Sequence, residues 1–222
     1  WMIPNAVACG NTFILKPSER DPSAPRFIVE LAQEAGFPPG VINMVNGDKV
    51  AVDRLLEHPD IKAVSFVGST PIAKYVYATG AAHGKRVQAL GGAKNHMIVL
   101  PDADINLAAD AAVSAAYGSA GERCMAISVA VFVGESKEWI NELAEKIGRV
   151  KPGLWNDEDA GFGPLISPQA KSRVLSLIEQ GKKEGATCLV DGSSFTVKGH
   201  EQGNWVGPTV FTDVTANMEI YQ

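Results

Sequence analysis

Short apolar runs alternate with helix-like segments between Thr12 and Ala82, and this alternation constrains the fold more than any other feature. The apolar runs are too short for helices and end at turn residues, so they predict buried strands. The segments between them repeat apolar residues at helical spacing. Such alternation predicts parallel βαβ units in a doubly wound α/β sheet. The predicted strands are 12–16, 41–45 and 63–67, and the predicted helices are 25–35, 50–57 and 71–82.

The second half of the chain follows a break at residues 89–94, which contain a glycine pair. Beyond the break, the pattern again alternates between short apolar runs and helical periodicity. We therefore predict two domains, 1–91 and 92–222, both partial. The predicted strands of the second are 97–100, 129–133, 188–190 and 209–211, and its predicted helices are 105–117, 138–150 and 168–184.

Composition excludes several classes of function. A net charge of −5 gives no electrostatic reason to bind nucleic acid or an anionic membrane. No apolar run approaches the length that spans a bilayer. Three widely spaced cysteines form neither a disulfide framework nor a zinc cluster, so we expect a reducing compartment and no metal.

Cys124 is the first candidate for chemistry. It follows two glycines and the charged pair Glu122-Arg123, between a predicted helix and an apolar run. A thiol at such a turn is accessible, and a thiolate attacks carbonyl carbon well. The alternative is a small buried residue, because free cysteines are usually core. Cys9 and Cys188, with small or apolar neighbours, are predicted to be core.

Two polar turns lie at the carboxyl ends of predicted strands, where open α/β sheets bind nucleotides. Gly68-Ser69-Thr70 precedes a predicted helix, and its free N–H groups and positive dipole end suit a phosphate. The alternative is an ordinary N-cap without a ligand. Lys16 and Glu19 suit ribose hydroxyls, or else form a solvated pair at a sheet edge.

Several segments, in their order and spacing, resemble the aldehyde dehydrogenase superfamily. Two further stretches, 123–126 and 84–96, resemble its methylmalonate-semialdehyde dehydrogenase branch. The resemblance runs over residues 1–222. The segments shared with the superfamily are 12–19 (TFILKPSE), 65–70 (SFVGST), 90–92 (LGG) and 121–124 (GERC).

This resemblance implies a Rossmann-like parallel-sheet domain that binds NAD (1–91), followed by an α/β catalytic domain that carries the nucleophile (92–222). Cys124 would attack the aldehyde to form a thiohemiacetal, pass hydride to NAD and retain a thioester. The cofactor-binding positions that match the family are Lys16, Ser18 and Glu19 for the adenosine ribose, Gly68 and Ser69 for the pyrophosphate, and Leu90 for the nicotinamide carboxamide.

Ala89 departs from the general family pattern. Most hydrolytic members carry a glutamate directly before Leu-Gly-Gly, as the base for the water that cleaves the thioester. No Asp or Glu occurs here between Ile61 and Pro101. Without that base water is a poor nucleophile, whereas a thiol reacts well with a thioester. We therefore expect coenzyme A as the acceptor and an acyl-CoA as the product, as in the branch that the chain resembles.

Arg123 is the candidate for substrate binding. A guanidinium beside the nucleophile suits a carboxylated, small-molecule semialdehyde. In the branch that the chain resembles, that carboxylate belongs to malonate or methylmalonate semialdehyde and leaves as carbon dioxide. The alternative is a salt bridge with Glu122 or a charge at a helix end.

The resemblance also implies further segments on both sides of the chain. An asparagine of the oxyanion hole should precede Trp1, and a glutamate that holds the nicotinamide ribose should follow Gln222. We therefore expect an internal fragment of a longer cytoplasmic or mitochondrial matrix enzyme, weakly active alone, in which the Cys124 N–H supplies half an oxyanion hole. Exposed sheet edges favour association, and a homo-oligomer, a tetramer in the family, is expected.

Two alternatives stay open. One is a hydrolytic, NAD(P)-dependent aldehyde dehydrogenase that uses another base. The other is a nucleotide-binding module without chemistry, in which Cys124 has ordinary reactivity.

Overall fold

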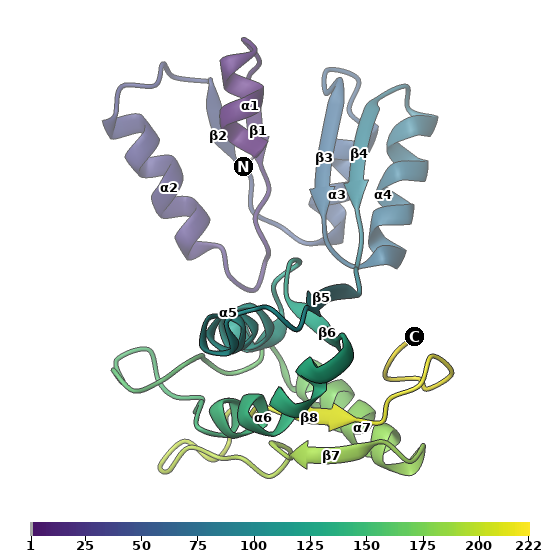
Figure 1. The fold of residues 1–222 in the computed structure, drawn as a ribbon. Helices are drawn as coiled ribbons and strands as arrows, with labels where there is room; N and C mark the ends of the chain where they lie inside the picture. Colours follow the sequence, from purple (N-terminus) through teal and green to yellow (C-terminus); the bar gives the residue numbers. More distant parts are fainter. Residues whose placement is uncertain (1) are drawn as a thin grey trace. The chain divides into compact units, whose positions relative to one another are not determined.

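The computed structural model describes residues 2–222, which divide into two compact units (Figure 1). The first ends at Gly92 and the second begins at Ala93. Parallel strands alternate with helices in both units, so the predicted α/β class is confirmed.

The first unit holds two parallel strand pairs. Its elements are α1 (Met2–Ala8), β1 (Phe13–Leu15), α2 (Ser23–Glu34), β2 (Ile42–Met44), α3 (Lys49–Glu57), β3 (Ala63–Val67), α4 (Thr70–Ala82) and β4 (Arg86–Leu90). β1 pairs with β2 in the register Phe13↔Ile42, and β3 pairs with β4 in the register Ala63↔Arg86. Within the described residues these are separate two-stranded ladders rather than one continuous doubly wound sheet.

Two elements of the first unit are absent from the sequence prediction. β4 overlaps the predicted break at 89–94, because exposed Arg86, Gln88 and Leu90 alternate with Val87 and Ala89. Only two apolar side chains therefore face inward, which is too weak a pattern for a strand. α1 was not predicted at all, and the exposed Cys9 follows it, so the prediction of a core cysteine there was wrong.

Close packing of α4 on β4 defines the core of the first unit. Leu56 of α3 and Val76 of α4 are 2% and 1% exposed. Gly80 is the point of closest approach, because a Cβ there would lie 2.7 Å from Val87 Cγ2. The buried Lys85 donates hydrogen bonds to the carbonyls of His58 (2.6 Å) and Ile61 (2.7 Å), which holds the loop between α3 and β3 against the start of β4.

The second unit begins with another parallel pair. Its elements are β5 (Asn95–Val99), α5 (Ile105–Tyr117), the 3₁₀ turn η1 (Gly118–Gly121), β6 (Ile127–Phe132), the 3₁₀ helix η2 (Gly134–Trp139), α6 (Ile140–Gly148), α7 (Pro168–Lys183), β7 (Thr187–Val190) and β8 (Val210–Thr212). β5 and β6 are parallel, whereas β7 and β8 are antiparallel. One core cluster joins α5 to α6 through Ala109, Ala112, Leu143 and Ile147.

The predicted helix 138–150 is shorter than its periodicity indicates. Ser136 is fully buried, and its hydroxyl donates to the carbonyls of Val99 (3.1 Å) and Val133 (2.8 Å). These bonds hold a 3₁₀ turn that includes Glu138 and Trp139, so the α-helix begins only at Ile140.

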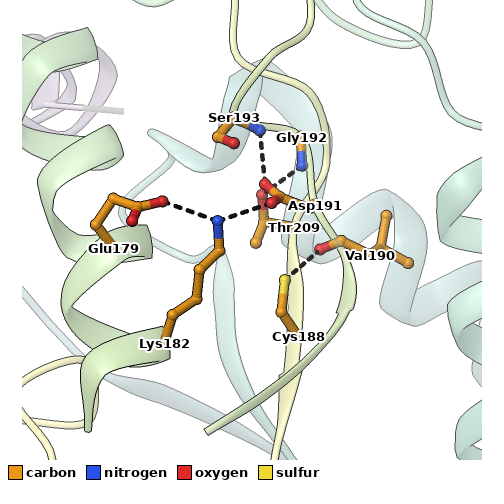
Figure 2. Close-up of polar contacts among 8 residues, drawn as sticks. All are labelled: Glu179, Lys182, Cys188, Val190, Asp191, Gly192, Ser193 and Thr209. Carbon is orange, nitrogen blue, oxygen red and sulfur yellow. Dashed lines mark hydrogen bonds and ion pairs between the residues drawn. The ribbon is translucent and has the colours of Figure 1, made fainter. Parts of the chain in front are cut away.

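A polar network ties the end of α7 to the β7–β8 pair (Figure 2). The Lys182 ammonium lies 2.8 Å from a carboxylate oxygen of Glu179 and 2.8 Å from one of Asp191. Asp191 also accepts the Ser193 N–H at 3.0 Å. Cys188 is half-buried on β7 rather than fully in the core, and its thiol contacts the Val190 carbonyl at 3.2 Å.

Candidate active site

The turn before Cys124 is left-handed over three residues. Ser119 and Ala120 both have φ of 55°, and Gly121 has φ of 72°. A non-glycine residue in this region costs about 1–2 kcal/mol. Ala120 is held there because it packs against the second core cluster, Leu165, Ile178 and Val206. The turn therefore redirects the chain from α5 into the segment that carries the candidate nucleophile.

Cys124 itself is exposed, which contradicts the alternative of a buried structural cysteine. It lies in a turn closed by a hydrogen bond from the Ala126 N–H to the Arg123 carbonyl, at 3.0 Å. The side-chain amide of Asn95 donates to the Cys124 carbonyl at 3.0 Å and to the Ala126 carbonyl at 2.9 Å. Sequence reasoning missed Asn95, because no local pattern connects it with a residue 29 positions later.

The two charged residues beside Cys124 have separate surroundings. Partial burial raises the pKa of Glu122, and a hydrogen bond from the Ile166 main chain opposes that shift. The Arg123 guanidinium packs over Gly118, where a Cβ would lie 2.6 Å from Nη1. Within residues 2–222, no ion pair joins Arg123 to Glu122, so the structure does not support the salt-bridge alternative.

In the first unit, Lys16 lies at the carboxyl end of β1. Its ammonium donates to the Gly47 carbonyl at 2.8 Å and to the Pro17 carbonyl, and lies 3.9 Å from Glu19. The turns after β1 and β2 therefore meet. Ser18 accepts the Arg20 N–H at 3.2 Å, so its hydroxyl supports the local turn. Lys16 is largely covered while Glu19 is open, an arrangement that suits a ribose with two neighbouring hydroxyls.

Ser69 occupies the N-cap of α4, but its side chain makes no capping hydrogen bond to the helix. The ordinary N-cap alternative therefore lacks its characteristic contact. Gly68 donates its N–H to the Leu90 carbonyl at 3.1 Å, which places the ends of β3 and β4 side by side. A hydroxyl that makes no capping hydrogen bond and the dipole of a 13-residue helix together fit a pyrophosphate.

Thr70, which sequence reasoning also missed, connects α4 with the Leu-Gly-Gly segment. Its hydroxyl accepts the Gly92 N–H at 3.0 Å. A Cβ on Gly91 would lie 2.7 Å from Thr70 Oγ1, so only glycine fits without displacement. Ala89 lines a concavity of about 280 Å³ beside these residues, together with Ala73, Lys74 and Tyr77. Among the described residues 2–222, no carboxylate lines this concavity, and residues 61–101 of the sequence contain no Asp or Glu.

The structure thus brings the candidate residues together in three groups. Lys16 and Glu19 form the first, Gly68, Ser69 and Leu90 the second, and Arg123 and Cys124 the third. In the described part of the chain, no His, Cys, Asp and Glu side chains gather as a metal site would require. Residues 2–222 also contain no helix with the length and apolar character needed to cross a membrane.

Comparison with known proteins gives consistent matches over the whole chain. The model of the aldehyde dehydrogenase family matches residues 1–222. Malonate-semialdehyde dehydrogenase from Pseudomonas aeruginosa is 54% identical, in an alignment that covers 100% of this chain and 45% of that protein. The acylating, mitochondrial methylmalonate-semialdehyde/malonate-semialdehyde dehydrogenase of Bos taurus is 50% identical over 100% of this chain and 41% of that protein.

Solved structures agree with these matches. A Sinorhizobium meliloti 1021 protein, described as a methylmalonate-semialdehyde dehydrogenase and crystallised with NAD, superposes with a TM-score of 0.94 at 56% identity. The match covers 100% of this chain and 45% of that one. The chain therefore spans less than half the length of the relatives that it matches.

Proposed function

Because this chain belongs to the aldehyde dehydrogenase family, we propose that the protein oxidises methylmalonate or malonate semialdehyde with NAD and transfers the acyl group to coenzyme A. The observation that carries the proposal is that Cys124 is exposed and held in a turn; the alanine at position 89 of the sequence supports coenzyme A as the acceptor. The names of the similar bacterial and bovine proteins support the same substrate class, and the word acylating in the bovine name supports coenzyme A.

The residues of the first unit fit NAD. Lys16 and Glu19 would hold the adenosine ribose, with Ser18 in the same turn, and Gly68 and Ser69 would hold the pyrophosphate at the start of α4. The Leu90 backbone would contact the carboxamide. When bound, NAD supplies the acceptor for the hydride that the substrate loses.

Cys124 and Arg123 would act on the substrate. The Arg123 guanidinium binds the substrate carboxylate, and Cys124 Sγ forms a bond to the aldehyde carbon. The Cys124 N–H donates to the oxygen that becomes negative in this step. After oxidation, Cys124 holds the acyl group as a thioester. The bond between the α-carbon and the carboxylate then breaks, carbon dioxide leaves, and the α-carbon takes up a proton from solvent in its place.

Release of the acyl group is the step that Ala89 decides. A methyl group cannot take a proton from water, so hydrolysis of the thioester lacks a base. The thiol of coenzyme A attacks the thioester carbonyl, the bond to Cys124 Sγ breaks, and the cysteine returns as a thiol or thiolate. The products are propionyl-CoA from methylmalonate semialdehyde and acetyl-CoA from malonate semialdehyde.

Product identification tests the proposal. The protein, expressed at its natural length, is incubated with the semialdehyde and NAD, with and without coenzyme A, and the products are identified by mass spectrometry. We expect acyl-CoA and NADH with coenzyme A, and no product from a Cys124→Ala control. Free carboxylic acid as the main product while coenzyme A stays unused would establish the hydrolytic alternative instead.

Alkylation of Cys124 separates an enzyme from a binding module. We expect iodoacetamide to modify Cys124 rapidly at neutral pH and NAD or substrate to slow the reaction. A thiol of ordinary reactivity, unaffected by either ligand, would favour a nucleotide-binding module.

The proposal extends to a homo-oligomeric assembly and to a cytoplasmic or mitochondrial matrix location; the bovine relative is named as mitochondrial.

A further inference from the structure

Asn95 is the first residue of β5 and faces the segment that leads from Cys124 into β6. The β5–β6 register shifts at this point, because Asn95 pairs with Ile127 while His96 pairs with Val129. The regular ladder is therefore interrupted just after the nucleophile turn. At this interruption the Asn95 side chain contacts the carbonyls of Cys124 and Ala126. Each of its two amide hydrogens thus has a main-chain acceptor.

These contacts restrain the peptide group that follows Cys124. The Cys124 carbonyl belongs to that group, and the Asn95 bond at 3.0 Å fixes its direction. The peptide group that precedes Cys124 is restrained independently, because its Arg123 carbonyl accepts the Ala126 N–H at 3.0 Å. Peptide groups are planar, so fixing both of them fixes φ and ψ of Cys124.

The orientation of two reactive groups follows from these dihedrals. The Cys124 N–H lies in the same peptide plane as the Arg123 carbonyl, and the direction of Cα–Cβ sets where Sγ can point. Within residues 2–222 the Cys124 N–H donates to no protein acceptor, so it stays available to a substrate oxygen. Asn95 thereby restrains the geometry of the candidate nucleophile through main-chain contacts.

We propose that Asn95 is a positioning residue, whose amide holds Cys124 so that Sγ and the N–H meet the same carbonyl group. The inference rests on the proposed function, because it takes Cys124 to be the nucleophile. A purely structural role, repair of the interrupted ladder, would affect stability and leave the chemistry of folded molecules unchanged.

The test compares Asn95→Ala with Val99→Ala in the protein at its natural length. Val99 is a buried residue of the same strand, so its truncation destabilises the second unit without touching the turn. Thermal unfolding, kcat, KM for NAD and the rate of Cys124 alkylation are measured for both variants. Asn95→Ser, which retains one donor, provides a milder second variant that tests the same contact if Asn95→Ala does not fold.

We expect Asn95→Ala to lower kcat by about tenfold to a hundredfold, because catalysis is sensitive to misplacement of a reacting group. KM for NAD should stay constant, and alkylation should change by less than about twofold, since the thiol is exposed in either case. Asn95→Ser should lie between Asn95→Ala and wild type, and Val99→Ala should keep the kcat of wild type despite its lower stability.

Equal kcat losses in Asn95→Ala and Val99→Ala, or an unchanged kcat in Asn95→Ala or Asn95→Ser, would overturn the positioning role. Cys124→Ala distinguishes this failure from failure of the proposed function. If Cys124→Ala retains activity, the nucleophile assignment itself is wrong. If it is inactive while the Asn95 variants behave like wild type, only the role of Asn95 is refuted.

Discussion

The hydroxyl of Thr70 accepts a hydrogen bond from the main-chain N–H of Gly92 at 3.0 Å. This bond joins the first residue of α4 to the segment that follows β4. A candidate cofactor residue lies close to each partner of this bond in the sequence. Ser69 directly precedes Thr70, and Leu90 lies two residues before Gly92. Thr70 therefore couples the candidate pyrophosphate turn to the candidate nicotinamide contact.

Thr70→Val keeps the shape of the side chain and removes its acceptor. We expect KM for NAD to rise about threefold to tenfold, the equivalent of one neutral hydrogen bond. Thr79→Val is the matched control on the same helix, away from Gly92, and should leave KM for NAD unchanged. Gly91→Ala should have a larger effect, because its Cβ would lie 3.1 Å from the Thr70 Cα as well as 2.7 Å from Oγ1. An unchanged KM in Thr70→Val would contradict the assignment of Leu90.

Ala89→Glu should convert part of the reaction to hydrolysis. The concavity of about 280 Å³ at Ala89 has room for a glutamate side chain, which would supply the missing base. A general base contributes about a hundredfold or more to such steps, so we expect at least a tenfold gain in acid released without coenzyme A. Ala89→Gln has the same size but no base and serves as the control. Equal acid release from the two variants would show that position 89 does not select the acceptor.

Arg123→Ala should weaken binding of carboxylated aldehydes selectively. Loss of a charge-assisted hydrogen bond raises KM for methylmalonate semialdehyde by about tenfold to a hundredfold, while KM for propanal stays constant. Gly118→Ala should produce a smaller rise, because its Cβ would occupy the position of the Arg123 guanidinium, 2.6 Å from Nη1. Equal increases for both aldehydes would identify Arg123 as a packing residue.

Asp191→Asn should lower stability in a pH-dependent manner. The hydrogen bond from Lys182, helped by Ser193, lowers the pKa of Asp191 from 3.8 to about 2 (Figure 2). A carboxylate with a lowered pKa stabilises the fold above its unfolded value and loses this contribution as pH falls. We therefore expect chemical unfolding to give a higher free energy of unfolding for wild type than for the variant. This difference should be constant near neutral pH and disappear between about pH 4 and pH 2.

The Lys182–Asp191 ion pair is partly exposed, with side chains 32% and 41% accessible, so the change in Tm at neutral pH should be about 2 °C. Asp159→Asn, an exposed carboxylate elsewhere in the second unit, provides the control and should show no such difference. A difference that persists undiminished at pH 2 would show that the ion pair is not its source.

Local periodicity was sufficient for most helices and strands of this chain. The helix 105–117 coincides with α5, and the strand 63–67 coincides with β3, because apolar spacing alone separates their buried and exposed faces. It failed at β4 and η2, where the contacts that hold the backbone come from other elements. Phe66 and Val67 pair with Ala89 and Leu90, and the buried Ser136 hydroxyl reaches back to Val99.

The sequence by itself determined the α/β class, the turn at Gly68-Ser69 and the absence of an acidic residue at position 89, because each depends only on residue type and local spacing. The tertiary structure alone decided that Cys124 is exposed and that Asn95 and Thr70 restrain the two candidate segments. Their partners lie 29 and 22 residues away, and local spacing cannot specify a contact that requires a loop of that length to close.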